Sequence, residues 1–298
     1  MTVAKITSQP VLSVVIPLFQ KVRHIANALE DAFRSCQIAG APFELIVVDD
    51  GSTDGSGAAA RAWADQDPER SAALRLLTQK NRGAAAARNA GWRAARSDLI
   101  LFLDADDRWV PHHVAELLGL TRDFPGAALY ADAWAVIDRS GARREHMFGI
   151  GSDRRGPLPC FFEAMSSGPM IVSSSTAAAP KSFLERSGGF PEGITHGEDR
   201  VGWGRLALLG DVVWSPRVGA VWDKSADNRS DLTALPSPPV AFRDFLRQAL
   251  RGVGNPTPLR ENIQTALAVE EAWLTGELRI YDHQTPTRYA PAANPEPI

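Results

Sequence analysis

Cysteine is scarce in this sequence, and its scarcity excludes two kinds of architecture. The 298 residues include only Cys36 and Cys160, which lie far apart in the chain. Two such residues cannot form the disulfide framework of a small secreted domain, and their spacing matches neither a metal-ligand set nor a redox pair. We therefore expect buried thiols in a reducing compartment, which predicts a cytoplasmic location.

Long hydrophobic runs and strong net charge are also missing. The apolar run at residues 11–19 contains Pro17 and falls well short of the roughly 20 residues that cross a bilayer, so we predict neither a signal peptide nor a transmembrane helix. The formal net charge is -3 without a dense Lys/Arg block, which argues against nucleic acid as a partner. With 44% hydrophobic and 22% charged residues, the chain has the composition of a globular protein.

Short β-rich runs alternate with helical patterns in the N-terminal part of the chain, which predicts a mostly parallel sheet with crossover helices. Between the first two runs, Ile25, Leu29 and Phe33 recur at helical spacing and predict an amphipathic helix. Sheets of this α/β class bind ligands beyond the carboxyl ends of their strands. The predicted strands are residues 12–17, 43–49, 73–78 and 99–103.

Further along the chain, residues 128–137 and 143–148 predict a hairpin around a turn at 138–141, which would add antiparallel strands to the sheet. Residues 180–187 predict a short helix that ends at Gly188. After a linker near residues 237–239, helical spacing returns around residues 242–250 and again at about 259–278. The proline-rich end, residues 286–298, is expected to be a mobile tail.

Acidic residues follow two of the predicted strands. Asp49 and Asp50 end the second strand, and Asp104, Asp106 and Asp107 follow the fourth. Because parallel strands share an edge, these carboxylates should lie together and suit Mg²⁺ or Mn²⁺, which bind one or two carboxylates plus substrate phosphates. Helix capping is the alternative: Asp50 or Ser52 would cap the helix after the second strand, and Asp107 the helix that opens near residue 111.

A glycine pattern offers a competing phosphate site. Residues 55–60 match the dinucleotide fingerprint G-x-G-x-x-G/A after the second strand. However, Asp49, Asp50 and Asp54 would crowd a pyrophosphate there, and no acid stands roughly 20 residues later to hold a ribose. A dehydrogenase is therefore a weak hypothesis.

Five segments form an ordered set of motifs: residues 13–19, 44–54, 81–83 with 87–91, 104–106 and 197–199. Together they resemble the inverting glycosyltransferases of family 2, which have the GT-A fold. The resemblance implies a Rossmann-like, mostly parallel central sheet flanked by helices, with an antiparallel extension and C-terminal helices. It also implies a nucleoside-diphosphate sugar as donor, with a UDP-sugar the first choice, and a divalent cation as cofactor.

The resemblance assigns donor contacts residue by residue. It places Asp50 at the base, Asp49 and Arg88 as supports of that pocket, Asp104 at the ribose side, and Asp106 on a cation that bridges the two phosphates. Asp104 is also assigned to the metal. The residues expected to bind the nucleotide-sugar are Pro17, Leu18, Phe19, Asp49, Asp50, Gly83, Arg88, Asp104 and Ala105.

The base that accepts the proton from the acceptor hydroxyl is expected at residues 195–199. Thr195 and Glu198 form a T-x-x-E capping box, which favours a structural role for Glu198 and leaves Asp199 as the better base. Burial would raise the pKa of Asp199, whereas the helix start would stabilise its anion. Residues 171–176 are expected either to line the acceptor side or to form an edge strand.

These assignments divide the chain into a catalytic domain at residues 1–235 and a helical extension with a tail at 236–298. The nucleotide-binding half would span about 10–110, and the acceptor half about 111–235. Glycan or lipid-linked acceptors are expected, together with peripheral contact with the inner membrane surface and a homo-oligomer as further hypotheses. Gln20 departs from the family, which commonly has asparagine there.

Two other functions compete with a glycosyltransferase. A nucleotidyltransferase that forms nucleotide-sugars would share the sheet and the acidic residues, but the N-terminal part has no glycine-rich triphosphate loop with a basic residue. A binding module would keep the nucleotide pocket and lack the chemistry.

Overall fold

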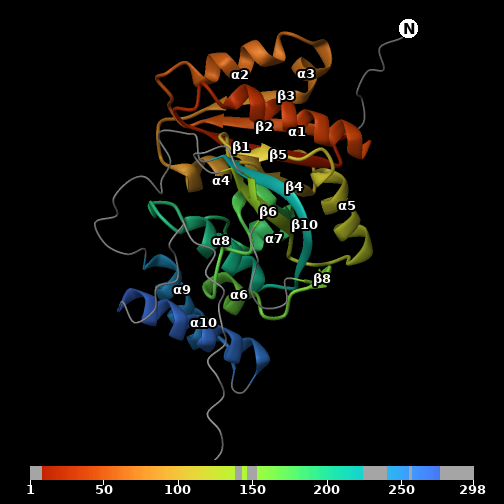
Figure 1. Ribbon diagram of the computed structural model, residues 1–298. Coiled ribbons are helices and arrows are strands. Elements are labelled where there is room, and N and C mark those ends of the chain that lie inside the picture. The colour runs from red at the N-terminus through yellow and green to blue at the C-terminus, as the bar shows by residue number, and fades with distance from the viewer. Residues whose placement is uncertain (1–8, 138–142, 146–152, 224–239, 255–256, 276–298) are drawn as a thin grey trace, which may run out of the picture.

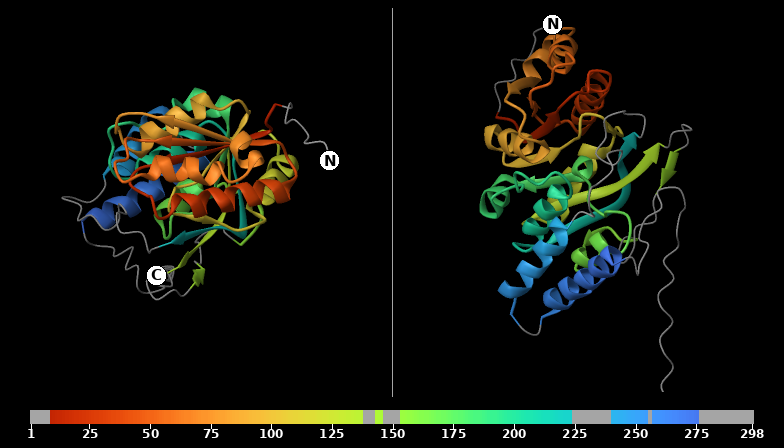
Figure 2. Two further views of the ribbon diagram at one scale, coloured as in Figure 1. Left: turned by 90° about the horizontal axis from the view of Figure 1, so that it is seen from above. Right: turned by 90° about the vertical axis from the view of Figure 1, so that its left-hand side faces the viewer.

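The computed structural model describes residues 9–137, 143–145, 153–223, 240–254 and 257–275 (Figure 1). One mixed sheet lies at the centre, with helices on both of its faces (Figure 2). Its strands follow the order β3-β2-β1-β4-β9-β6-β10-β5. The predicted α/β class is confirmed.

The first half of the sheet is parallel, as predicted, because β1 pairs with β2 and β4, and β2 pairs with β3. The predicted bounds differ from the observed ones by at most one residue at either end. The strands are β1 (Leu12–Leu18), β2 (Phe43–Asp49), β3 (Leu74–Thr78) and β4 (Leu99–Phe102).

The second half is mixed. β9 runs antiparallel to β4 and β6, β6 runs parallel to β10, and β5 and β8 run antiparallel to β10. β7 pairs antiparallel with β6, which confirms the predicted hairpin, although its turn and residues 146–148 lie outside the described residues. These strands are β5 (Arg108–Trp109), β6 (Leu129–Ile137), β7 (Arg143–Glu145), β8 (Gly156–Pro157), β9 (Ala177–Pro180) and β10 (Val212–Asp223).

Crossover helices cover the sheet. The predicted amphipathic helix is α1, which buries Ile25, Leu29 and Phe33 and ends at Gly40 with a left-handed φ of 69°. Seen from above, α1 and α2 cover one face of the parallel half and α4 the other (Figure 2). The helices before the strand β6 are α1 (Ile25–Ala39), α2 (Ser56–Ala64), α3 (Pro68–Ala73), α4 (Ala84–Ala94) and α5 (His113–Asp123).

Helix α4 lies unusually close to β1 because Gly91 carries no side chain. A Cβ atom at this position would stand 2.3 Å from Cγ1 of Val15. Any larger residue would push the helix off the sheet. This close approach sets the distance between α4 and the sheet. It thereby also sets the position of Arg88, which lies one turn earlier on α4.

The C-terminal half adds the remaining helices. The short helix predicted at residues 180–187 is α7, and Gly188 ends it with a φ of 75°. The helix predicted from residue 259 is α10, whose end is observed at Leu274, while the linker at 237–239 and the tail at 286–298 lie outside the described residues. These helices are α6 (Phe161–Ser166), α7 (Lys181–Ser187), α8 (Glu198–Ala207), α9 (Ala241–Gly252) and α10 (Pro258–Leu274).

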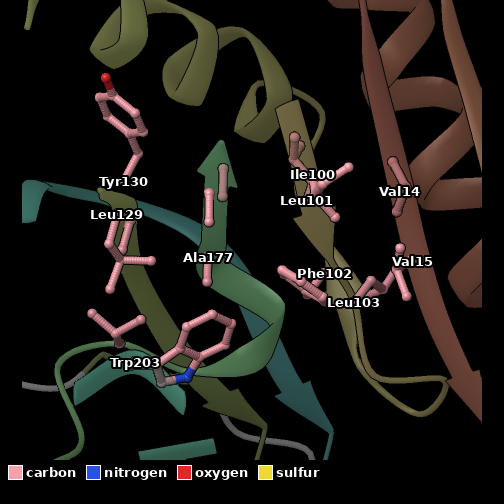
Figure 3. Close-up of a cluster of buried hydrophobic side chains, with 14 of the residues drawn as sticks. Val14, Val15, Ile100, Leu101, Phe102, Leu103, Leu129, Tyr130, Ala177 and Trp203 are labelled. Atoms are coloured by element: carbon pink, nitrogen blue, oxygen red, sulfur yellow. The ribbon is translucent and has the colours of Figure 1, made fainter. Parts of the chain in front are cut away.

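The core joins the two halves of the sheet. Side chains of β1, β4, β6 and β9 belong to one buried cluster with Trp203 of α8, which is fully buried (Figure 3). The Trp203 ring makes edge contacts with Phe102 and Phe190 at centroid distances of 5.5 and 4.9 Å. Because fully burying such a side chain is worth several kcal/mol, α8 has a fixed position beneath the end of β4.

Helices α9 and α10 pack on α6 and α8 (Figure 1). Leu246 and Ile263 are fully buried in this contact. The division at residue 235 stays a prediction. Within the described residues, no helix is both long and apolar enough to span a membrane.

Candidate active-site cleft

A cleft of about 1000 Å³ opens at the carboxyl ends of β1 and β4 and extends to α8 and α10. It brings together nearly all the predicted site residues, which come from segments more than a hundred positions apart. Asp49 alone among them does not line it. The predicted residues that line the cleft are Pro17, Leu18, Phe19, Asp50, Gly83, Arg88, Asp104, Ala105, Asp106, Glu198 and Asp199.

Asp50 holds the loop that precedes α4. Its carboxylate accepts hydrogen bonds from the Gln79 side chain at 2.7 Å and from the backbone N–H groups of Arg82 and Gly83 at 2.9 and 2.8 Å. The alternative that Asp50 or Ser52 caps the helix after β2 is wrong, because α2 has no side-chain cap and Asp50 faces another loop. This carboxylate instead orders the Asn-Arg-Gly turn at the edge of the cleft.

Asp49 supports the neighbouring turn from inside the protein. It is 8% exposed and accepts a hydrogen bond from the Ser52 backbone N–H at 2.9 Å. A Cβ atom at Gly57 would stand 2.4 Å from Oδ2 of Asp49, so this glycine lets α2 approach the strand. The glycine pattern at residues 55–60 therefore serves packing, and none of its residues lines the cleft.

Arg88 links the two halves of the cleft. Its guanidinium is 4% exposed and donates to Asp104 at 2.8 Å and to Glu198 at 3.0 Å. Burial alone would lower the pKa of Arg88, but the carboxylates of Asp104, Glu198 and Asp199 outweigh it and raise that pKa. Arg88 is thus a permanently charged link between α4, the loop after β4, and α8.

The loop after β4 carries three carboxylates in different environments. Asp104 pairs with Arg88, and Asp106 forms an ion pair with Nζ of Lys21 at 2.8 Å. Asp107 is 7% exposed, and burial, with added repulsion from Asp106 and Asp104, raises its pKa well above the ordinary value. The loop therefore concentrates negative charge where cations already lie beside two of its carboxylates.

The prediction that Asp107 caps the next helix is wrong. Helix α5 begins at His113 and has no side-chain cap at His112. Asp107 instead accepts a hydrogen bond from the hydroxyl of Ser175, and the same hydroxyl accepts one from the Asp104 backbone N–H at 3.1 Å. Ser175 thereby ties both ends of the acidic loop to η1 (Ser174–Thr176).

Residues 171–176 are not an edge strand, because their second half forms the η1 turn just before β9. Ser173 and Ser174 line the cleft, while Ser175 lies behind the acidic loop. The strand prediction failed because the apolar pair Ile171 and Val172 is buried without forming a strand.

Glu198 and Asp199 begin α8, and the predicted capping box does not form. The cap position is Gly197 in a left-handed conformation, with no side-chain cap, and Glu198 turns to Arg88 instead. Burial raises the pKa of Glu198 to about 7, with repulsion from Asp199 adding to the rise. Burial also raises the pKa of Asp199 and outweighs the opposing effect of Arg88.

The far wall of the cleft is aromatic, and its residues Trp134 and Trp273 were not predicted from sequence. Trp134 of β6 and Trp222 of β10 meet edge to face at a centroid distance of 5.4 Å, and Trp273 of α10 also lines the cleft. Met165 and Met170 complete this apolar wall. Their positions come from long-range packing, which no local sequence pattern reveals.

Helix α10 is also tied to α8 by charge. Arg200 donates to both carboxylate oxygens of Glu270, to the Met165 carbonyl at 2.9 Å, and lies over the Phe242 ring at 4.3 Å. Glu270 is only 1% exposed. The residue next to Asp199 is therefore anchored by the C-terminal helices.

Two further residues that line the cleft, Lys21 and Glu270, were not predicted from the sequence. Lys21 follows the predicted contacts of residues 17–19, and its position beside them in sequence was the signal that could have identified it. Glu270 gave no such signal. Within the described part of the chain, no cluster of three or more His, Cys, Asp or Glu side chains is arranged to hold a metal without further ligands.

Solved structures share this fold. The Staphylococcus aureus TarS fragment 1–349 in complex with UDP-GlcNAc superposes with a TM-score of 0.65 at 17% identity, covering 86% of this chain and 70% of that one. A mannosyltransferase from Pyrobaculum calidifontis in complex with GDP-Man and Mn²⁺ gives 0.60 at 21% identity, covering 91% and 76%. The fold is the GT-A fold of glycosyltransferases.

Sequence comparison defines the family. Residues 13–168 match Glycosyl transferase family 2, so the chain belongs to this family of enzymes. An uncharacterized glycosyltransferase of Nostoc sp. is 31% identical over 129 residues, which cover 43% of this chain and 37% of that protein. The undecaprenyl-phosphate 4-deoxy-4-formamido-L-arabinose transferase of Pseudomonas aeruginosa is 35% identical over 107 residues, or 36% and 31%. The matches span about a third of these relatives.

Proposed function

We propose that this protein is a metal-dependent inverting glycosyltransferase that transfers a sugar from a nucleoside-diphosphate sugar to a hydroxyl of a glycan or glycolipid. One observation carries the proposal: donor-side carboxylates and the acids of α8 meet in a single cleft, joined by Arg88. A UDP-sugar is the first donor to test. The solved relatives with UDP-GlcNAc and GDP-Man bind donors of this class.

The residues present suit a divalent cation. Carboxylate oxygens are hard ligands, and Mg²⁺ or Mn²⁺ completes its coordination with phosphates and water. Oδ1 of Asp107 is buried without a hydrogen-bond partner beside the same loop. Asp106 and Asp104 would hold the ion, which when bound neutralises charge that develops on the departing diphosphate.

The donor would lie along the loops after β1, β2 and β4. We expect Asp50 to accept from a ring N–H of the base and Asp104 to contact the ribose, with Pro17 and Phe19 lining the same cleft. Arg88 would orient Asp104 for that contact, because its guanidinium lies 2.8 Å away.

The acceptor would approach from the aromatic wall. Sugars have apolar faces, which suit Trp134, Trp222 and Trp273. Asp199 would take the proton from the attacking hydroxyl, because Glu198 is already bound to Arg88. Direct attack opposite the leaving diphosphate inverts the anomeric centre. The undecaprenyl-phosphate transferase among the relatives supports a lipid-linked acceptor. An acceptor of this kind would require sugar transfer at a membrane surface.

Ligand-dependent unfolding tests this proposal. We would measure the unfolding midpoint with UDP, GDP, dTDP and CMP, each with Mn²⁺ or EDTA, for the wild type, Asp106→Ala and Asp98→Ala. Asp98 is an exposed acid at the opposite end of β4 and controls for loss of charge. A ligand at about 100 times its dissociation constant stabilises a fold by roughly 2.7 kcal/mol, which is a shift of several degrees. A metal-dependent shift with one nucleotide, lost only in Asp106→Ala, is the expected result. No shift with any nucleotide would contradict the proposal.

A further inference from the structure

The ion pair between Lys21 and Asp106 lies where the proposed function requires a metal ligand. Nζ of Lys21 is 2.8 Å from Oδ2 of Asp106, and the two side chains are 11% and 14% exposed. Both residues line the cleft. The carboxylate assigned to the cation therefore already has a positively charged partner.

The backbone around Lys21 is fixed by the neighbouring loop. Gln20 has a left-handed φ of 54°, which is uncommon for a residue with a side chain. Its N–H donates to Ser52 Oγ at 3.1 Å, and the N–H of Lys21 donates to Ser56 Oγ at 2.8 Å. The Val22 N–H donates to Asp54 at 3.0 Å. This chain of contacts turns the lysine stem toward the acidic loop.

The side chain of Gln20 strengthens the same arrangement. Its carboxamide oxygen accepts from the backbone N–H groups of Thr53 and Asp54, each at 3.1 Å, and its nitrogen donates to the Thr53 hydroxyl at 2.9 Å. The departure from asparagine at this position therefore gives a longer amide that bridges the two loops. Lys21 therefore follows a turn that these hydrogen bonds hold in place.

The charges on the acidic loop are paired by cations of the chain itself. Arg88 partners Asp104, and Lys21 partners Asp106. An ammonium is a compact point charge that a divalent cation can replace at a carboxylate. Both cannot lie against the same oxygen, because their charges repel at contact distance.

We propose that Lys21 is an internal competitor for the divalent cation at Asp106, so that the metal binds weakly by itself and tightly only together with the donor diphosphate. This inference rests on the proposed function. The diphosphate supplies oxygen ligands to the ion and an anionic partner to the displaced ammonium. By linkage, a diphosphate that relieves the competition raises metal affinity by the same factor by which metal raises diphosphate affinity.

Direct metal binding tests this inference without turnover. Free hydrated Mn²⁺ would be measured by electron paramagnetic resonance during titration of the wild type and three variants, with Mn²⁺ as the only ligand. Lys21→Met removes the competitor, and Lys21→Arg keeps its charge. Arg34→Met removes one positive charge from an exposed position on α1 outside the cleft lining.

We expect Lys21→Met to bind Mn²⁺ roughly fivefold more tightly than the wild type, the ratio that corresponds to an ion pair of about 1 kcal/mol. Lys21→Arg and Arg34→Met should remain within about twofold of the wild type. Equal or weaker binding by Lys21→Met, with a normal unfolding midpoint in EDTA, would overturn the inference, as would absence of Mn²⁺ binding in every variant. Failure of the proposed function would be distinguishable from failure of this inference. In that case the wild type would transfer no sugar, although its Mn²⁺ affinity would still differ from that of Lys21→Met.

Discussion

The two walls of the cleft are built in different ways. The donor wall consists of the loops after β1, β2 and β4. Hydrogen bonds between adjacent loops hold it in place, such as those that Asp50 accepts from the backbone N–H groups of Arg82 and Gly83. On the acceptor wall, side chains from β6, β10, α8 and α10 meet through packing and through the pair of Arg200 with Glu270. Local sequence encodes the first wall, and tertiary contacts position the second.

Under the proposed function, this difference separates donor binding from acceptor selectivity. The donor wall would bind the diphosphate that all nucleoside-diphosphate sugars share, and its loops are held in place by hydrogen bonds. The acceptor wall depends on bulky side chains whose replacement changes the space available. Arg88 is the described residue that pairs with carboxylates from both walls.

The largest effect should come from the acids of α8. Asp199→Asn keeps the shape of the base and removes its proton acceptor, so kcat should fall by roughly 10² to 10⁴-fold. Nucleotide affinity, measured by calorimetry, should stay within about twofold because the donor wall is unchanged. Glu198→Gln is the matched comparison: if it abolished transfer while Asp199→Asn did not, the two roles would have to be exchanged.

On the donor wall, Asp106→Ala should lower kcat/KM by at least about a hundredfold, because the cation that offsets leaving-group charge loses a ligand. Asp98→Ala at the other end of β4 should leave kcat/KM unchanged. Steady-state assays across Mn²⁺ concentrations check this. An Asp106→Ala enzyme with full activity in EDTA would show that transfer needs no metal.

Contact between α8 and α10 should account for a measurable part of the stability. Glu270→Gln leaves the Arg200 charge largely buried without its carboxylate, which should cost about 2 kcal/mol in the free energy of unfolding. The exposed pair of Arg247 with Glu271 joins α9 to the same helix α10. Glu271→Gln should therefore cost no more than about 0.5 kcal/mol. Urea unfolding of both variants tests the contrast, and equal costs would contradict it.

The pH dependence should follow the raised pKa values of the α8 acids. Burial raises the pKa of Glu198 to about 7 and also raises that of Asp199, so protons bind to this pair at higher pH than to ordinary carboxyls. Protonation of Asp199 removes the base, so kcat/KM should fall as pH decreases, and this fall should begin at a higher pH than for an ordinary carboxyl. A limb near pH 4 would mean that the donor complex abolishes the shift.

The smallest effect tests the aromatic wall. Trp273→Ala should raise the KM for the acceptor roughly three- to tenfold, as expected for loss of one aromatic contact, while the donor KM stays constant. Leu274→Ala, next to it on α10 and outside the cleft lining, should change neither constant. An increase confined to the donor KM would place Trp273 on the other substrate.

Sequence predicted most of the donor wall because strand patterns and strand-end acids are local features. The four parallel strands and the gathering of Asp50, Asp104 and Asp106 in one cleft are confirmed. The capping assignments were wrong for Asp107 and Glu198. Their actual partners, Ser175 and Arg88, come from distant parts of the chain, and a local capping pattern cannot predict such contacts.

The acceptor wall could not be predicted for the same reason. Trp134 and Trp273 lie in segments whose spacing indicates only buried strand or helix, and the place of Trp273 in the cleft depends on how α10 packs against α6. Arg200 was not singled out because its partner, Glu270, lies 70 residues further on.

Helix α10 offers a route by which specificity can diverge. It contributes Trp273 and Glu270 to the cleft yet supplies none of the residues that hold the loops of the donor wall. Recombination or drift in this one helix would therefore change which acceptors fit while the nucleotide-sugar and its chemistry stay the same. The family match ends at residue 168, before this helix begins. Under the proposed function, exchange of α10 between relatives with the same donor motifs is therefore a direct way to change the acceptor.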